Sequence, residues 1–350
     1  MNEFPGIIND LLATTLDRGA SDLHIGAGHN PVIRLNGQLI SIDVGPVSET
    51  IIYEWLSRTM TPRALEDYER DGDADFSFGW RDGERFRGTL YRERGHMTLA
   101  LRHLKARIPS LDEIGVPVVV REWANRETGL VLVTGPTGSG KSTTIASLVE
   151  QANQTRSAHI VTIEDPVEYV FTPVRSTIHQ REIPSDSQSF ARAVRAGLRE
   201  DIDIMVVGEL RDLATMSAAI TVAETGHLVF ATLHNSSAHQ AVDRMIDAFD
   251  SSEQQLVRTR LASCLVGVVH QRLIKSERGG RVAAYEVLTG NYAVKNLIRE
   301  GKTHQIPNVM TTSKADGMIL LAEAVQKLVA AGAISPAEGA RFTTQNSLNG

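Results

Sequence analysis

An apolar run, a glycine-rich segment and a helix start follow one another from Leu130 to Thr143, in the sequence LVLVTGPTGSGKST. Residues 135–142 match the pattern G-x-x-x-x-G-K-[ST], which is typical of a phosphate-binding loop. Glycines let the backbone bend closely around an anion, so that successive N–H groups and the following helix N-terminus point at phosphate oxygens. A glycine-rich turn that fits the pattern by chance is the alternative, but it does not explain the adjoining strand and helix.

The last residues of this segment supply charge and a metal ligand. Lys141 adds a mobile positive charge, and the Ser142 hydroxyl suits Mg²⁺, which binds few protein oxygens besides those of the nucleotide phosphates. We therefore expect ATP or GTP to bind here. The residues expected to bind it are Gly135, Pro136, Thr137, Gly138, Ser139, Gly140, Lys141, Ser142 and Thr143.

Carboxylates follow two further apolar strands. The segment TIEDPVE places Glu164 and Asp165 directly after a strand, where a parallel sheet binds its ligand, and one of them could orient the attacking water or the Mg²⁺ shell. A capping or solvated turn is the alternative. The strand IMVV delivers Glu209 to the same edge, with Gly208 where many such enzymes carry Asp. We expect Glu164 or Asp165 to support Mg²⁺, and Glu209 to polarise water.

Histidines stand at both ends of the apolar strand LVFATL, His227 before it and His234 after it. A single histidine is more often a structural residue, and this is the alternative for each. Two of them beside a strand, in a chain with this loop, favour a sensor of the γ-phosphate.

Arginines are candidates because phosphoryl transfer spreads negative charge over oxygens that a guanidinium stabilises, often from another domain or subunit. Arg87 and Arg102 lie in predicted N-terminal strands, and Arg195 and Arg211 flank the strand that leads to Glu209. Surface salt bridges are the alternative role. Arg102 is the preferred candidate, followed by Arg87.

The elements that position these residues fall into two groups, and the first occupies the N-terminal hundred residues. Helical spacing and antiparallel alternation there predict helices and strands in separate blocks rather than in alternation. The expected elements are a helix from Pro5 to a stop at Gly19, a hairpin over 32–42 turning at Asn36-Gly37, helices over 48–60 and after Pro62, and strands at 75–78, 85–91 and 97–104.

The second group begins after 105–117 (KARIPSLDEIGVP), whose prolines and glycine predict a linker. Four apolar runs, at 130–134, 159–163, 204–207 and 227–233, then predict a parallel sheet covered on both faces. A hairpin over 269–288 and mostly helical residues follow. We expect an α/β fold with a first domain at 1–104 and a second at 118–350, whose last helices span about 290–350.

Composition is that of a soluble globular protein of 350 residues, with 42% hydrophobic and 22% charged residues. The net charge of −6 argues against a protein that binds duplex nucleic acid. The chain lacks an 18-residue apolar run and a basic leader, so we expect a cytoplasmic location. Cys264 cannot form an internal disulfide; we expect a buried thiol, with a reactive role as the alternative.

These motifs closely resemble those of the hexameric secretion-type ATPases and, within them, the type IV pilus retraction ATPases. The resemblance is carried by GASDLH at 19–24, the phosphate-binding loop, Glu164-Asp165-Pro166, VGELRD at 207–212, and the histidine box from TGH at 225–227 to TLH at 232–234. It implies a PAS-like first domain, a RecA-like second domain and a six-chain ring with nucleotide between domains and neighbours. It further implies that Glu209 is the catalytic glutamate, that Gly208 is the family's own residue, and that the arginines approach phosphates.

Two features bear on the choice within the family. A single cysteine excludes the four-cysteine metal insert that extension and type II secretion ATPases usually carry. Residues 293–300 (AVKNLIRE) closely resemble the AIRNLIRE motif associated with retraction, with Lys295 keeping the charge but losing the planar guanidinium. An amphipathic surface helix is the alternative. Residues 234–237 (HNSS) also depart from the more usual His-Thr-Asn-Ser.

The resemblance implies a Mg²⁺-dependent ATPase whose cycle moves one domain against another and drives pilus disassembly and twitching motility. Its expected cofactors are ATP and Mg²⁺, and its expected place is the inner face of the cytoplasmic membrane. Expected partners are further copies in a homohexamer, an inner-membrane pilus platform protein and a paralogous retraction ATPase, without nucleic acid. The alternatives are an accessory retraction or extension motor, a nucleotide-gated switch with slow turnover, and a nucleic-acid translocase, which the lack of a basic stripe disfavours.

Overall fold

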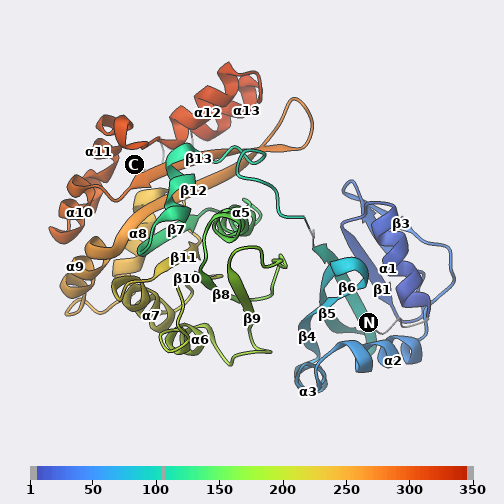
Figure 1. Cartoon of the computed structure of the whole chain (residues 1–350). Helices are drawn as coiled ribbons and strands as arrows, with labels where there is room; N and C mark the ends of the chain where they lie inside the picture. Colours follow the sequence, from blue (N-terminus) through green and yellow to red (C-terminus); the bar gives the residue numbers. More distant parts are fainter. Residues whose placement is uncertain (1–5, 105–106, 345–350) are drawn as a thin grey trace. The chain divides into compact units, whose positions relative to one another are not determined.

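The computed structural model describes residues 6–104 and 107–344 (Figure 1). Pro5, Lys105 and Ala106, which belong to an expected helix start and the expected linker, lie outside the described residues. The chain divides into two compact units. The first comprises residues up to Arg107 together with 166–170, and the second comprises 108–165 and 171 onward. Each unit has its own sheet and apolar core.

The first unit is a six-stranded antiparallel sheet in the order β3-β2-β1-β6-β5-β4, with helices packed on one face. Alternate strand residues such as Leu23, Ile25 and Leu101 join this core, and the residues between them face away from it. The elements are α1 (Ile7–Asp17), β1 (Asp22–Gly26), β2 (Val32–Leu35), β3 (Gln38–Ser41), α2 (Glu49–Thr59), α3 (Pro62–Asp71), β4 (Asp73–Gly79), the 3₁₀ turn η1 (Arg81–Gly83), β5 (Arg85–Glu93) and β6 (His96–Leu104).

The hairpin between β2 and β3 forms where the sequence predicts it. Asn36 and Gly37 both have positive φ angles, 50° and 86°, which is the backbone of a type I′ turn. Helix α2 begins after Ser48, whose hydroxyl accepts a hydrogen bond from Ile51 N. No such turn motif marks the central strand β1, and the sequence did not predict its bounds.

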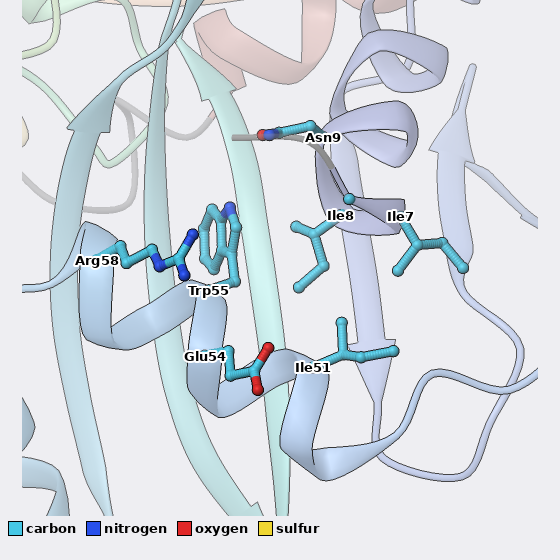
Figure 2. A pocket seen from close by; sticks show the side chains of 8 residues that line it. Ile7, Ile8, Asn9, Ile51, Glu54, Trp55 and Arg58 are labelled. Atoms are coloured by element: carbon cyan, nitrogen blue, oxygen red, sulfur yellow. The ribbon is translucent and has the colours of Figure 1, made fainter. Parts of the chain in front are cut away.

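A pocket of about 260 Å³ lies between α1 and α2 in the first unit (Figure 2). Ile7, Ile8 and Ile51 give it an apolar wall, and Glu54 and Arg58 bring charges to it. Its lining contains none of the residues expected to bind nucleotide.

The second unit is a seven-stranded sheet in the order β13-β12-β7-β11-β10-β8-β9. All neighbouring strands are parallel except β12 and β13. The strands are β7 (Gly129–Thr134), β8 (His159–Glu164), β9 (Thr177–Glu182), β10 (Ile204–Val207), β11 (Leu228–Leu233), β12 (Leu265–Lys275) and β13 (Arg281–Thr289).

Helices pack around this sheet, and Figure 1 shows α12 beside β13, α13 beside α12, and α10 beside α9. Every residue of β7, β10 and β11 is buried, as expected of parallel strands covered on both faces. The helices are α4 (Val118–Glu122), α5 (Lys141–Thr155), α6 (Phe190–Gly197), α7 (Leu213–Glu224), α8 (Ala238–Asp247), α9 (Gln254–Cys264), α10 (Tyr292–Arg299), α11 (Ile306–Thr312), α12 (Leu321–Ala330) and α13 (Pro336–Thr344), with 3₁₀ turns η2 (Trp123–Asn125), η3 (Thr303–Gln305) and η4 (Lys314–Asp316).

Part of the expected linker packs against the second unit. The hydroxyl of Ser147 donates to the carbonyl of Pro109 at 2.7 Å, and the hydroxyl of Tyr285 donates to the carbonyl of Ile114 at 2.9 Å. The part of the expected linker from Ile108 to Pro117 thus belongs to the second unit.

The structure also describes the surroundings of Cys264 and the lengths of the helices. Cys264 is 8% exposed at the end of α9, and burial raises the pKa of its thiol to about 12, which keeps the thiol protonated. Among the helices that the structure describes, none has the length and apolar character needed to cross a bilayer.

Candidate functional site

The phosphate-binding loop joins the end of β7 to the start of α5. Thr134 is the last residue of the strand, and Lys141 is the first of the helix. Gly138 and Gly140 have φ angles of 75° and 90°, which only glycine adopts without strain. The helix N-terminus therefore opens directly onto the loop, with its unpaired N–H groups available to an anion.

The side chain of Lys141 lies within the loop and is only 8% exposed. Its ammonium donates to the carbonyls of Gly135 at 2.9 Å and Pro136 at 3.1 Å. The buried hydroxyl of Ser139 has no hydrogen-bond partner among the described residues. The loop thus holds a cation and a free hydroxyl where phosphate oxygens would be bound.

A chain of polar contacts runs from this lysine across the carboxyl ends of the strands. The ammonium of Lys141 is 3.5 Å from Nδ1 of His234, whose Nε2 is 3.3 Å from Oε1 of Glu209. The other oxygen of Glu209 accepts from Nε of Arg211 at 2.8 Å. Nη1 of Arg211 lies 3.8 Å from Asp165. Five residues expected from the sequence are therefore connected in one network.

Strand register explains why these residues meet. Val207 lies beside Ile163 in β8 and Ala231 in β11, so the residues after all three strands share one edge. Gly208 then passes close to the neighbouring chain end, because a Cβ there would lie 3.1 Å from the carbonyl oxygen of Ile163 and 3.3 Å from Cα of Glu164. A glycine at this position is thus favoured by space, where many related loops carry Asp.

The candidate Mg²⁺ residues differ in their surroundings. Asp165 belongs to the network through Arg211. Oε1 of Glu164 accepts hydrogen bonds from Thr162 at 2.6 Å and Gln180 at 3.2 Å, which hold it over β8 and β9. Ser142 is partly exposed in the first turn of α5.

Comparison with known proteins places this site in a family. A family profile described as Type II/IV secretion system protein matches residues 98–338, which is most of the chain and includes the whole network. The chain belongs to this family. It is 41% identical to the type IV pilus retractation ATPase PilT of Pseudomonas aeruginosa, over 94% of this chain and 95% of that protein.

Two further similarities agree with this one. The chain is 42% identical to a twitching motility protein of Neisseria gonorrhoeae, over 91% of this chain and 85% of that protein. A crystal structure of the pilus retraction motor PilT with bound ADP superposes with a TM-score of 0.89 at 42% identity, covering 96% of each chain. The chain is accordingly an ATPase of the type II/IV secretion family, with the mixed α/β fold of its relatives.

His227 lies apart from this network within the chain. It precedes β11, whose six residues separate it from His234, so the two histidines lie about 20 Å apart at opposite edges of the sheet. Its Nδ1 is 3.0 Å from the carbonyl oxygen of Val222 in α7. The structure therefore does not place His227 beside the loop of its own chain, because a strand carries its two ends to opposite edges.

Three arginines expected at the site lie outside the network. Arg195 is exposed on α6, where its Nε donates to the carbonyl of Ala191 at 3.1 Å. Arg87 and Arg102 belong to the first unit, directly opposite each other on β5 and β6. Both point away from the apolar core and are well exposed, with 45% and 69% of the side chain accessible.

The face that carries these two arginines also holds a buried carboxylate. Asp22 lies opposite Arg102 on β1 and accepts its Nε hydrogen bond at 2.8 Å. Burial alone would raise the pKa of Asp22, but hydrogen bonds from Ser21 and Arg102 outweigh it, and the pKa is lowered. Asp22 therefore stays ionised and holds Nε of Arg102, while the rest of the arginine side chain remains accessible.

The departure at Lys295 in the AVKNLIRE segment has a local explanation. Its ammonium donates to the carbonyl of Ser263 at 3.3 Å, near the C-terminus of α9, where helix carbonyls lack partners and a positive charge is favoured. A lysine satisfies this single acceptor without the fork of an arginine.

Sequence reasoning missed one buried residue beside the loop, Gln271 on β12. It lies more than 120 residues further along the chain, and no motif marks it.

Proposed function

We propose that this chain is the ATP-hydrolysing motor of type IV pilus retraction. The observation that carries the proposal is the continuous network from Lys141 through His234 to Glu209, which joins a phosphate-binding loop to a carboxylate suited to activating water. Close similarity to PilT over nearly the whole chain supports the biological assignment.

The loop would bind the nucleotide phosphates, and Mg²⁺ fits the available oxygen donors. The Ser142 hydroxyl stands in the first helical turn, and Asp165 and Glu164 follow the neighbouring strand. Among the described residues, no three His, Cys, Asp or Glu side chains gather to hold a metal. Mg²⁺ would therefore depend on the nucleotide phosphates and Ser142, with the carboxylates acting through water. When bound, it would neutralise charge on the phosphates.

Glu209 would orient and deprotonate the attacking water. Its two oxygens are already held by His234 and Arg211, so the carboxylate is fixed while remaining 22% exposed. His234 lies between this carboxylate and Lys141 and would report the presence of the γ-phosphate to both.

The two units suggest how hydrolysis produces movement. We infer that the first unit is a PAS-like domain and the second a RecA-like core, joined near the expected linker at 105–117, in a homohexameric ring. The exposed Arg102 and Arg87 would then approach nucleotide held by the same or a neighbouring chain. We further infer a cytoplasmic location at the inner membrane face, against a pilus platform protein.

Steady-state ATPase assays on the wild type and Glu209→Gln test the motor assignment. We expect the variant to bind ATP but to turn it over at least about 100-fold more slowly, because the amide cannot accept the proton of water. Equal and negligible turnover in both proteins would favour a nucleotide-gated switch. Deletion of the gene should leave excess pili and abolish surface motility; loss of pili would instead indicate an extension motor, and unchanged pili an accessory one.

A further inference from the structure

Gln271 is a buried amide that connects the end of the phosphate-binding loop to α5. It lies on β12 with 1% of its surface exposed. Its Nε2 donates to the carbonyl of Ser139 at 2.5 Å, and its Oε1 accepts from the hydroxyl of Thr144 at 2.8 Å. One side chain thus holds two points that lie on either side of Lys141 in the sequence.

These two bonds fix the orientation of the amide. A backbone carbonyl only accepts, so the NH₂ group of Gln271 must face Ser139, and the carbonyl end must face the hydroxyl of Thr144. The two bonds together require one donor and one acceptor, and an amide of this length supplies both. Leu supplies neither.

The loop glycines leave room for this strand. A Cβ on Gly140 would lie 3.0 Å from Nε2 of Gln271, and a Cβ on Gly135 would lie 2.5 Å from its backbone oxygen. Since backbone atoms cannot move aside as a flexible side chain does, the loop is seated directly on β12 at this residue.

The direction of one peptide group follows from this contact. In a trans peptide the C=O of Ser139 and the N–H of Gly140 point in opposite directions. Holding that oxygen toward Gln271 therefore turns the N–H of Gly140 away from β12. The N–H groups at this turn and at the start of α5 are those that an anion would use.

We propose that Gln271 is a positioning residue that aims the Gly140 N–H at the nucleotide phosphates. The inference rests on the proposed function, because it requires a nucleotide in the loop. Gln271 touches no reacting atom in this account. Its loss should weaken nucleotide binding more than it slows the chemical step.

Three variants separate positioning from a merely structural role. Gln271→Leu removes both bonds, and Thr144→Val removes only the bond to α5. Gln271→Glu changes with pH: a protonated carboxyl can donate to Ser139 and accept from Thr144, whereas the carboxylate can only accept. We expect burial to raise the pKa of this introduced glutamate, which brings the change toward neutral pH.

The measurements are the Kd of ADP, kcat and KM for ATP, and the melting temperature without nucleotide. Gln271→Leu should raise the Kd of ADP and the KM about tenfold or more, with kcat changed less than about threefold. For Thr144→Val, the Kd of ADP, kcat and KM should each stay within about threefold of the wild type. Gln271→Glu should bind ADP nearly as tightly as the wild type at pH 6 and progressively more weakly toward pH 9.

Several outcomes would overturn this role. One is an unchanged Kd of ADP in Gln271→Leu while the wild type hydrolyses ATP. If Gln271→Leu does not fold, Gln271→Glu still tests the role. The role is overturned if the Kd of ADP for Gln271→Glu changes with pH no more than that of the wild type. A wild type that neither binds ADP nor hydrolyses ATP would instead refute the proposed function.

Discussion

Nε2 of His234 lies 3.3 Å from Oε1 of Glu209, while Nδ1 of the same ring lies 3.5 Å from the ammonium of Lys141. An ammonium can only donate, so the contact with Lys141 is a hydrogen bond in the tautomer whose Nδ1 accepts and whose ring proton is on Nε2. In that tautomer the ring donates to Glu209. His234 therefore links the cation that would contact phosphate to the carboxylate that would activate water.

Replacement of His234 by Ala should lower kcat by at least about tenfold, because Glu209 loses a hydrogen bond that fixes its orientation. The KM for ATP should change less, since the loop and Lys141 remain. Steady-state ATPase assays at saturating ATP, with nucleotide titrations, measure both quantities.

His227→Ala is the matched control for this prediction. Its ring lies at the other end of β11, beside the carbonyl of Val222, so kcat should stay within about twofold of the wild type. Equal losses of kcat in the two variants would show that the contacts of His234 with Glu209 and Lys141 do not explain its effect on turnover.

Much of the site could be predicted because parallel strands end at one edge. The apolar runs identified β7, β8, β10 and β11, and their following residues include Asp165, Glu209 and His234. The same geometry separates His227 from His234. The length of the strand LVFATL already contained this information, since six extended residues span about 20 Å.

Other parts depend on contacts that local sequence does not encode. Strand β9 reads TIHQRE and lies at the edge of the sheet, where half-exposed polar residues replace the apolar run that marks a buried strand. Gln271 is placed beside Ser139 only by the pairing of β12 with β7. Such partners are fixed by tertiary topology, so a one-dimensional pattern cannot reveal them.

Gly135→Ala should weaken nucleotide binding, raising the Kd of ADP by more than about tenfold. Gly135 has a φ of 146°, and its new Cβ would lie 2.5 Å from the backbone oxygen of Gln271 and 2.6 Å from Oγ of Ser139. The loop would have to move off β12. The melting temperature of the variant without nucleotide is the control for folding; tight binding of ADP by Gly135→Ala would contradict the seating of the loop.

Arg102→Ala should lower kcat by about tenfold or more if its guanidinium stabilises the transferring phosphoryl group. Arg195→Ala should leave kcat nearly unchanged, because Arg195 is bonded to its own helix turn. The melting temperature of each variant shows whether the lost Asp22 contact, rather than catalysis, explains an effect.

In the proposed ring, mixed assemblies test whether Arg102 acts on a neighbouring chain. Chains carrying Arg102→Ala are combined with chains carrying Glu209→Gln, each nearly inactive alone. If the arginine acts between chains, about a quarter of the sites in an equal mixture combine an intact Glu209 with an intact Arg102, and activity returns. No recovery, after subunit exchange has been verified, would assign the arginine to its own chain.

His270 should make the second unit less stable in acid. It is fully buried on β12, and both ring nitrogens lack hydrogen-bond partners among the described residues. Burial, helped by the charges of Arg272 and Lys141, lowers its pKa to about 3. Between pH 6.5 and about 3 the unfolded chain therefore takes up a proton at this residue that the folded chain does not.

Stability should accordingly fall with decreasing pH in that window, by up to about 1.4 kcal/mol for each pH unit from this residue. His270→Leu removes the titrating group, so the difference in unfolding free energy between the variant and the wild type isolates its contribution from that of the carboxylates. Urea unfolding at intervals from pH 7.5 to 4.5 measures it. Parallel pH profiles for the two proteins would mean that His270 becomes protonated within the folded unit, and that the space around it admits a partner for the charge.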